Sequence, residues 1–578
     1  MNYQNNLSDK YLLHYVRKII KGHVPQEMVR SMMPGRFVLS VLVIILISES
    51  IIATATNNFS ESVDVYSDPV SALEGLPEPV QDPKLCSLCT EIAYPEPGFV
   101  PIRGVKGSGK NQTILLDIYL NLSQDRDIEE LSPYIKELKG IREGMIEAEV
   151  YADDLLEIRN ISFVAYMDIP ISIQPTSPIN QSDLIAVMGL EKLIHQENIT
   201  GDGVFVTVMD YNFYMNNLTR SYLTKNTTLI SNMYYLNDQV HGTACSEVVS
   251  QLAPGAGLYL VDIGGTRVQF TDALNEFMAG GSEVDIISCS VDFPVGSGIF
   301  NVEDDLSRSI KEVTDSGVFW VNAAGNQAQR HWSGQFNDSD GDGYHDFSPE
   351  DPSLNISAER GDIITVHLSW DDWVDGDYGY STQDYDLYMI SPNKKKYSSK
   401  NPQLGVIGQK PIEVAIMVAP MDGIYQVFIK EKNASRNAQF HLFIDKPHEL
   451  DEYQVNSSSV GPIASLPEVI TVGAINASTM ELEPYSSQGP TFDGRLKPEL
   501  VAPTNIRTVS YFPGYFDGTS AATPCVAACL ALSLEKMRGD GREGDEIEDL
   551  LFSNAVDLGP TGPDNQYGYG LVSLKFLQ

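Results

Sequence analysis

Short runs of apolar and β-branched residues alternate with stretches of helical spacing between residues 184 and 326. Runs such as Val204–Met209 and Val284–Ser290 follow turn-forming residues, which is typical of strands buried on both faces. Between them, residues 270–278 and 306–313 repeat their apolar positions at helical spacing. Strands that alternate with helices predict an α/β fold with a doubly wound parallel sheet. The other strands expected in this region are Gly257–Val261 and Val318–Val321.

A shorter mixed pattern precedes this region. Residues 113–120, 145–151 and 161–166 have the composition and alternation of strands, and residues 128–138 and 153–159 have helical spacing. This pattern predicts a small α+β domain at residues 111–178.

The chain after residue 326 has a different pattern, with short strands separated by turn signals and no helical spacing. This pattern predicts an inserted all-β sandwich. The strands expected in it are Ile363–Trp370, Tyr385–Ile390, Glu413–Ala419 and Gly423–Ile429.

With 578 residues, the chain is long enough for several domains. The α/β pattern resumes after the insertion, so we expect the α/β domain to be built from two parts. The expected organisation is an N-terminal signal peptide or anchor (1–55), a linker rich in Pro and acidic residues (56–110), the α+β domain (111–178), the first part of the α/β domain (182–326), the insertion (327–460) and the second part (461–578).

A serine at the start of an apolar helix is the first candidate for chemistry. Ser520 follows Gly518 and Thr519, and good helix formers come after it, with Pro524 expected in the first helical turn. At that place, free backbone N–H groups and the helix dipole stabilise an anion, as a nucleophilic serine requires. A small-residue turn that caps a core helix explains this stretch equally well when it is taken alone.

A nucleophilic serine needs a base, and the base needs an orienting acid. His241 begins another apolar helix, and Asp210 ends the buried strand Val204–Met209, at the edge where open α/β sheets place their sites. Asn326 follows a further buried strand and can donate to an oxyanion together with the N–H of Ser520. The three candidates of a Ser-His-Asp triad therefore occur in the order Asp210, His241, Ser520.

Six motifs in this order resemble the subtilisin-like serine proteases, the subtilases of peptidase family S8. The resemblance covers residues 184–326 and 465–578. It implies that Asp210, His241 and Ser520 form the catalytic triad and that Asn326 is the oxyanion donor. The motifs are the strand that ends at Asp210, His241-Gly242-Thr243, Ala323-Ala324-Gly325-Asn326, residues 469–474, residues 485–490 and Gly518-Thr519-Ser520.

The resemblance also implies where a polypeptide substrate binds. Residues 285–292 resemble the family's substrate-pairing strand, so a substrate strand is expected beside Ser288–Val291. Asp292 is expected at the pocket rim, where we hypothesise that it favours cleavage after basic residues. The α+β domain resembles the family's inhibitory propeptide, with an unrelated accessory domain as the alternative. The expected substrate-binding residues are Ser288, Ser290, Asp292, Ala323, Ala324 and Gly325.

The chain departs from the family pattern at three positions. The family follows its aspartate with Thr or Ser and then Gly, whereas this chain has Tyr211 and Asn212. Cys525 stands five residues after the serine, where a His is usual, and Asp292 stands where Gly is common. These changes affect the expected local geometry more than the assignment of the triad.

The insertion opens with carboxylates at alternate positions and a Gly at the sixth, as in an EF-hand-type calcium loop. The closing Glu of such a loop is replaced by Pro349, and a solvated acidic turn is the alternative. In the sandwich after the loop, Trp370-Asp371-Asp372 and residues 384–388 resemble the pre-peptidase C-terminal domains often attached to secreted proteases, although here the domain would be inserted. The expected ligands of a structural calcium ion are Asp338, Asp340, Asp342 and Asp346.

The chain carries 39 basic and 78 acidic residues, a net charge of −39. This charge disfavours nucleic acid and anionic membranes as partners. We expect a monomer that needs no cofactor for its chemistry.

An apolar run at residues 37–48, preceded by basic residues and followed by Ala53-Thr54-Ala55, is typical of a secretory signal peptide. We favour cleavage, and a retained membrane anchor stays open. Of six cysteines, Cys86 and Cys89 are spaced for a tight disulfide, and a Cys245–Cys525 bridge is an alternative to buried free thiols.

These observations favour a secreted subtilisin-like serine endopeptidase that is made as a zymogen and works through an acyl-enzyme. The alternative function is a catalytically silent surface or adhesion protein on the same scaffold. It is suggested by the altered turn after Asp210 and by the large insertion.

Overall fold

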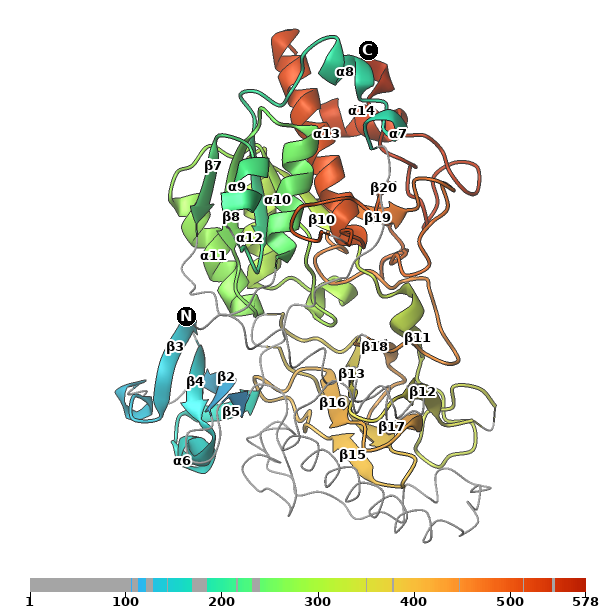
Figure 1. Cartoon of the computed structure of the whole chain (residues 1–578). Helices are drawn as coiled ribbons and strands as arrows, with labels where there is room; N and C mark the ends of the chain where they lie inside the picture. Colours follow the sequence, from blue (N-terminus) through green and yellow to red (C-terminus); the bar gives the residue numbers. More distant parts are fainter. Residues whose placement is uncertain are drawn as a thin grey trace, which may run out of the picture. The chain divides into compact units, whose positions relative to one another are not determined.

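The protein is described by a computed structural model (Figure 1). The described residues are 105–106, 113–120, 128–142, 144–168, 184–214, 217–230, 240–349, 351–376, 379–445, 447–512, 514–542 and 546–577, and all of them belong to one compact unit within residues 69–578. The expected signal peptide, nearly all of the linker, Cys86 and Cys89 lie outside them. Within these ranges, no helix has the length and apolar character needed to span a membrane.

The predicted parallel sheet is present, and it has seven strands. Every neighbouring pair within it is parallel. Its strands are mainly apolar because helices cover both faces of the sheet. In spatial order the strands are β20 (Leu500–Pro503), β19 (Val469–Ile475), β10 (Phe319–Ala323), β9 (Ile286–Cys289), β6 (Phe205–Asp210), β8 (Gly257–Asp262) and β7 (Thr227–Ile230).

The helices belong to two separate cores. Helices α10 (His241–Leu252) and α13 (Thr519–Gly539) share one core with the sheet, and α11 (Arg267–Ala279) and α12 (Asp305–Asp315) share the other. This confirms the doubly wound α/β fold. Shorter helices are α7 (Leu184–Val187), α8 (Glu191–His195), α9 (Asn217–Tyr222) and α14 (Ile547–Ser553).

The strand order reverses between β6 and β9, because the chain proceeds from β6 to β7 and β8 on one side and from β9 to β10 on the other. Open α/β sheets bind ligands at such a switch point, beyond the carboxyl ends of the strands. Asp210 ends β6, Ser290 follows β9 and Asn326 follows β10, so three of the candidate residues lie at this edge.

The small N-terminal domain has an antiparallel sheet in the order β1-β2-β4-β3, with β5 paired to β2. The helix predicted over residues 128–138 is wrong: a 3₁₀ helix covers Ile128–Leu131, and a strand begins at Ile135. Pro133 explains the difference, since proline cannot continue a helix. The elements are β1 (Val105–Lys106), β2 (Thr113–Leu120), β3 (Ile135–Arg142), β4 (Met145–Tyr151), α6 (Leu155–Asn160) and β5 (Val164–Asp168).

One carboxylate of this domain contacts the α/β domain. Glu147 on β4 accepts from the hydroxyl of Thr266 at 2.6 Å and from the side-chain amide of Gln269 at 2.9 Å. Thr266 is the N-cap of α11, so Glu147 lies at the N-terminus of that helix. Helix N-termini attract negative charge.

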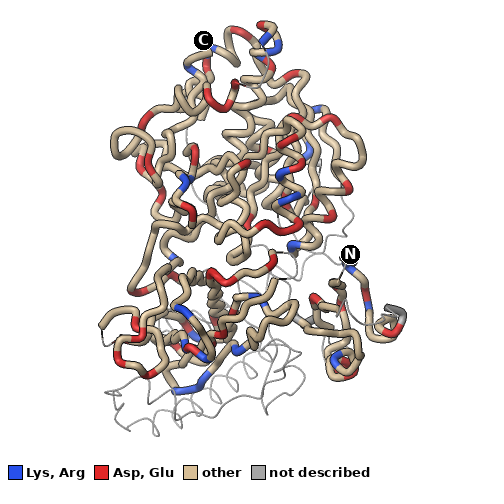
Figure 2. The backbone as a smooth tube through the Cα atoms, turned by 180° about the vertical axis from the view of Figure 1, so that it is seen from behind, with Lys and Arg blue, Asp and Glu red and all other residues tan. Residues whose placement is uncertain are grey.

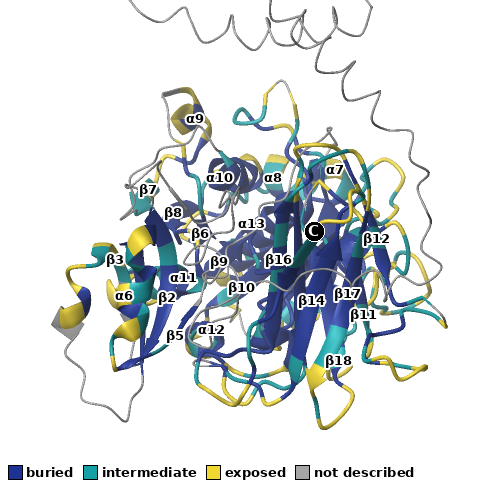
Figure 3. Ribbon diagram, turned by 90° about the horizontal axis from the view of Figure 1, so that it is seen from below, coloured by how far each residue is buried: buried dark blue, intermediate teal, exposed yellow. Residues whose placement is uncertain are grey.

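The insertion contains two four-stranded antiparallel sheets with a common core that includes Trp370, Tyr385 and Phe440. The aromatic side chains are fully buried, and Figure 3 shows the strands of these sheets as mostly buried. The first sheet has the order β11 (His331–Gln335), β18 (Gln439–Ile444), β13 (Ile363–Trp370), β16 (Ile412–Val418), and the second has the order β12 (Leu354–Ala358), β17 (Gly423–Asn433), β14 (Asp384–Ile390), β15 (Lys396–Ser399).

The excess of acidic residues is not confined to one part of the molecule. Figure 2 shows Asp and Glu distributed along the described backbone of all three folded regions. A distributed acidic surface supports solubility and does not mark one binding face.

Candidate active site

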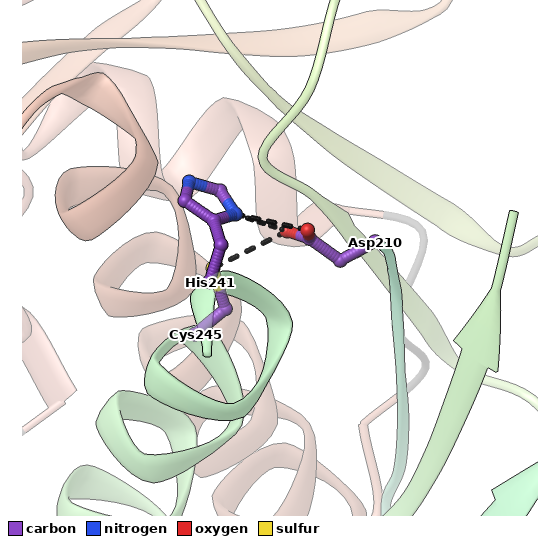
Figure 4. Close-up of side chains that lie close together, drawn as sticks. All are labelled: Asp210, His241 and Cys245. Atoms are coloured by element: carbon purple, nitrogen blue, oxygen red, sulfur yellow. Dashed lines mark hydrogen bonds and ion pairs between the residues drawn. The ribbon is translucent and has the colours of Figure 1, made fainter. Parts of the chain in front are cut away.

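Asp210 and His241 form a buried hydrogen-bonded pair (Figure 4). The Nδ1 atom of His241, the first residue of α10, lies 2.9 Å from Oδ1 and 3.0 Å from Oδ2 of Asp210. Because a carboxylate only accepts, Nδ1 carries the proton and Nε2 keeps its lone pair. Within the described residues, Nε2 is buried and has no hydrogen-bond partner. This is the tautomer that a general base needs.

Two further donors hold the Asp210 carboxylate. The backbone N–H of Tyr211 donates to Oδ1 at 2.7 Å, and the thiol of Cys245 donates to Oδ2 at 3.4 Å. Cys245 lies one helical turn after His241 on α10 (Figure 4). The carboxylate is therefore fixed by groups from β6 and α10 together. Burial, followed by the nearby charge of Asp210, raises the pKa of the Cys245 thiol, which keeps it protonated.

Ser520 is the second residue of α13 and is fully buried. Gly518 precedes the helix with φ +88°, a left-handed conformation that favours glycine. The Ser520 hydroxyl donates to the carbonyl of Ser290 at 3.1 Å. Proton transfer to His241 requires the hydroxyl to be redirected toward Nε2.

Pro524 is the sixth residue of α13, so the expectation that it lies in the first turn is wrong. A proline has no N–H, and the carbonyl four residues before it loses its helical partner. That carbonyl belongs to Ser520, and Ser290 Oγ donates to it at 3.0 Å. Ser290 therefore exchanges hydrogen bonds with the candidate nucleophile through both its hydroxyl and its carbonyl.

Asn326 reaches the same place from β10. Its Oδ1 accepts from the N–H of Thr519 at 3.0 Å and from the Thr519 hydroxyl at 3.1 Å. Its Nδ2 is buried and has no partner among the residues that the structure describes. A fixed amide donor without an acceptor, next to the N-terminus of the Ser520 helix, is the arrangement of an oxyanion hole.

Ala323 ends β10, and Ala324 and Gly325 lead from it to Asn326. The Ala324 N–H donates to Val472 at 3.0 Å, which extends the sheet by one residue. Gly325 has φ +101°, and its N–H donates to the Thr519 hydroxyl at 3.2 Å. These contacts hold the turn against the start of α13.

Ser288 is not available to a substrate strand, so its expected role is wrong. It lies inside the sheet, paired with Val208 of β6 on one side and Val321 of β10 on the other. Its side chain is fully buried. The segment leaves the sheet after Cys289, which ends β9.

The Asp292 carboxylate is bound by backbone amides. It accepts from Phe293 at 2.7 Å, from Ile463 at 3.1 Å and from Ala464 at 3.0 Å. Burial raises the pKa of Asp292 to about 7, against the opposing effect of these donors. Through these three hydrogen bonds, the Asp292 carboxylate links its own segment to residues 463–464. These contacts do not favour the hypothesis that Asp292 selects basic residues.

Three of the four expected calcium ligands lie together. Ligand oxygens of Asp338, Asp340 and Asp346 are within 4.8 Å of one another. Asp342 is not part of this group, and its Oδ1 accepts from the N–H of Tyr344 at 2.8 Å. Several loop amides also donate to the cluster; for example, Gly341 and Gly343 donate to Asp338 at 2.7 and 3.0 Å. This set of oxygen donors suits a hard cation such as Ca²⁺.

The hypothesis of a Cys245–Cys525 bridge is wrong. Both cysteines are free and buried, as are Cys289 and Cys529.

Two aromatic contacts of His241 were not predicted. The ring of Tyr211 stacks on the imidazole with centroids 5.8 Å apart and an interplanar angle of 20°. The ring of Phe516 meets it edge-on, with centroids 5.4 Å apart. The unusual residue after Asp210 was a signal for the first contact, whereas nothing in the local pattern indicated the second.

The model of the subtilase family of peptidases matches residues 448–570. This segment contains Ser520, while Asp210, His241 and Asn326 precede it. The minor extracellular protease Epr of Bacillus subtilis is 33% identical over 123 residues, which are 21% of this chain and 18% of that protein. Subtilisin E of Bacillus subtilis is 33% identical over 120 residues, which are 21% of this chain and 29% of that protein. The chain therefore spans less than a third of the length of these relatives.

The fold is similar to that of the CspB protease of Clostridium perfringens. The two structures have a TM-score of 0.51 at 17% sequence identity, over 68% of this chain and 98% of that chain. At this identity the likeness shows a shared fold, and it extends well beyond the segment matched in sequence.

Proposed function

Because the chain belongs to the subtilase family, we propose that it is a serine endopeptidase that hydrolyses polypeptides through Asp210, His241 and Ser520. One observation carries this proposal: the Asp210 carboxylate holds Nδ1 of His241 at 2.9 and 3.0 Å, and Nε2 has no hydrogen-bond partner in the part of the chain that the structure describes. A buried imidazole in that tautomer is ready to accept a proton. The start of α13 supplies the serine from the same core.

The proposed reaction proceeds through an acyl-enzyme. His241 Nε2 takes the proton of Ser520, and Oγ attacks the carbonyl carbon of the scissile bond. The N–H of Ser520 and Nδ2 of Asn326 stabilise the oxyanion that forms. His241 then gives the proton to the leaving amine, and a water molecule activated by the same imidazole releases the acyl group. Asp210 holds the imidazole and stabilises its charged form.

We further propose that the enzyme is exported as a zymogen in which the α+β domain is the propeptide. The contact of Glu147 with Thr266 and Gln269 supports this role, because it joins the domain to the α/β domain. The apolar N-terminal run supports export, and so does the extracellular relative Epr, by its name. A retained N-terminal anchor remains the alternative to secretion.

A structural calcium ion is a further part of the proposal. Asp338, Asp340 and Asp346 would hold it, and its charge would offset the repulsion among carboxylates that lie within 4.8 Å of one another. The ion would stabilise the loop between β11 and β12 and take no part in the hydrolysis.

Labelling with a fluorophosphonate tests the proposed activity, since this probe reacts with activated serines. We expect the purified protein to be labelled and Ser520→Ala not to be labelled. Absence of labelling, also after the residues before Leu184 are removed by proteolysis, would favour the catalytically silent alternative. In that case the inserted sandwich becomes the candidate binding surface.

A further inference from the structure

Tyr211 joins Asp210 and the helix that begins at His241 through its backbone. Its N–H donates to Oδ1 of Asp210 at 2.7 Å, and its carbonyl accepts from the N–H of Gly242 at 3.2 Å. Gly242 directly follows His241 on α10. Asn212 then turns the chain with φ +63°, a left-handed conformation that asparagine tolerates. The backbone of Tyr211 is therefore held at both ends by the elements that carry the triad.

The side chain of Tyr211 packs against the imidazole in an offset stack. The two rings are stacked, with an interplanar angle of 20° and centroids 5.8 Å apart. Phe516 contacts the imidazole edge-on at 5.4 Å, and Tyr511 packs on Phe516 with centroids 5.2 Å apart. His241 is 3% exposed, so this aromatic enclosure leaves little room for water.

The hydroxyl of Tyr211 does not explain the placement of the ring. It is buried and has no hydrogen-bond partner among the described residues. A buried hydroxyl without a partner costs free energy, so other contacts must hold the ring in place. The stack on His241 is a contact of the kind that does so.

The stack with Tyr211 restricts a rotation of the imidazole that the hydrogen bond with Asp210 does not restrict. Contacts between Nδ1 and the two carboxylate oxygens set the position of one edge of the imidazole, at 2.9 and 3.0 Å. They constrain rotation of the ring about the Nδ1–carboxylate axis only weakly, because a hydrogen bond tolerates a wide range of out-of-plane angles at its acceptor. The ring contacts of Tyr211 and Phe516 with the imidazole restrict this rotation.

We propose that Tyr211 is a positioning residue, whose ring holds the imidazole of His241 in the plane that presents Nε2 to the Ser520 hydroxyl. This inference rests on the proposed function. When His241 becomes an imidazolium, the aromatic face also favours its charge. Packing of the Tyr211 ring therefore restricts the orientation of the buried imidazole. In a more exposed site, hydrogen bonds with water or small polar groups would do this.

The test compares three variants of the full-length protein. Tyr211→Thr removes the ring, Tyr211→Phe removes only the hydroxyl, and Tyr222→Thr is the matched control, because Tyr222 is 55% exposed at the end of α9. Two quantities are measured: the rate of fluorophosphonate labelling and the low-field NMR signal of the Nδ1 proton of His241. The probe is small, so its rate reports the activated serine and not recognition of a long substrate.

We expect Tyr211→Thr to lower the labelling rate about 10- to 100-fold, as loss of alignment does. Its Nδ1 proton signal should broaden through exchange with water. Tyr211→Phe and Tyr222→Thr should both keep the wild-type labelling rate and a sharp Nδ1 proton signal. If Tyr211→Thr does not fold, Tyr211→Leu fills the site without an aromatic face and is measured instead.

The outcomes separate the two proposals. A Thr or Leu variant that is labelled at the wild-type rate and keeps a sharp Nδ1 signal overturns the role of Tyr211 and leaves the protease intact. A Phe variant as slow as the Thr variant also overturns it, because the hydroxyl would then be the functional group. A wild-type protein that is not labelled, also after the residues before Leu184 are removed by proteolysis, overturns the proposed activity and this inference with it.

Discussion

Thr519 donates both its backbone N–H and its hydroxyl to Oδ1 of Asn326, at 3.0 and 3.1 Å. These two bonds fix which side of the carboxamide faces the start of α13, so Nδ2 is the group left to donate. Ser520 follows Thr519 directly. One residue therefore couples the candidate nucleophile to the side-chain donor of its oxyanion hole.

Loss of the Asn326 donor should slow the chemical step. We expect Asn326→Ala to lower kcat about 10²- to 10³-fold with little change in KM, because the amide stabilises charge that develops in the transition state. Steady-state kinetics on a peptide substrate measure both constants. Thr519→Val should show part of the same loss and Thr519→Ser almost none, since serine keeps the hydroxyl. Equal kcat values for the Val and Ser variants would contradict the coupling.

Asp210 should contribute to the orientation of the His241 imidazole more than to substrate binding. Asp210→Asn places an amide opposite Nδ1 and favours the wrong tautomer of His241, so we expect kcat to fall about 10⁴-fold. Asp262 offers a control, because it is paired with Asp210 on the neighbouring strand β8 and its carboxylate accepts from Gly264 at 2.9 Å. Asp262→Asn should leave the labelling of Ser520 unchanged. Similar losses in the two variants would point to a general effect on the strand ends.

The location of the candidate site was predictable because its signals are local. Asp210 ends a strand and Asn326 follows one, while His241 begins α10 and Ser520 is the second residue of α13. These ends show in the sequence as a change from an apolar run to small and polar residues. The parallel sheet then brings the ends to one edge without any further information.

Other features depend on contacts that the local pattern does not contain. Ser288 belongs to the same run of residues as Ser290. It is enclosed because the neighbouring strands β6 and β10 extend far enough to pair with it on both sides. The contact of Phe516 with His241 joins two segments that are distant in the chain. Residues 128–138 have helical spacing, but Pro133 and the pairing of β3 with β4 prevail. In this last case, strand pairing overrides a local helical preference.

Asp292 should contribute to stability. In Asp292→Gly the amides of Ile463 and Ala464 lose their acceptor, which costs about 1–3 kcal/mol for each buried group left without a partner. We expect a lower Tm by calorimetry, and a smaller decrease for Asp292→Asn, which keeps one accepting oxygen. A peptide library run on the same samples tests the hypothesis of a basic preference. A stable Gly variant that has lost cleavage after Lys and Arg would support that hypothesis and exclude the structural role.

Calcium should bind to the loop between β11 and β12. We expect isothermal titration of the full chain to show binding in the range of about 10⁻⁴–10⁻³ M, as in extracellular modules. Asp340→Asn should weaken it more than Asp342→Asn, because Asp342 is outside the group of oxygens within 4.8 Å. No heat of binding at millimolar calcium would exclude the site.

Burial of the Glu147 carboxyl group should make the chain less stable as the pH rises. Burial, followed by the charge of Asp117, raises the pKa of Glu147 in the folded protein above its ordinary value of about 4.3. Below that value the carboxyl group is protonated in both the folded and the unfolded chain. As the pH increases, the unfolded chain loses the proton first, so stability falls until the pH has passed through the raised pKa.

Glu147→Gln removes this ionisation and keeps an oxygen for the Thr266 hydroxyl. In the Ser520→Ala background, which prevents self-cleavage, its Tm should match that of the parent at low pH and exceed it increasingly toward alkaline pH. Glu157→Gln on the exposed face of α6 is the control and should follow the parent at every pH. A Tm difference between Glu147→Gln and the parent that does not change with pH would mean that the pKa of Glu147 is the same in the folded and unfolded chains. In that case the hydrogen bonds and the N-terminus of α11 offset the effects of burial and of Asp117.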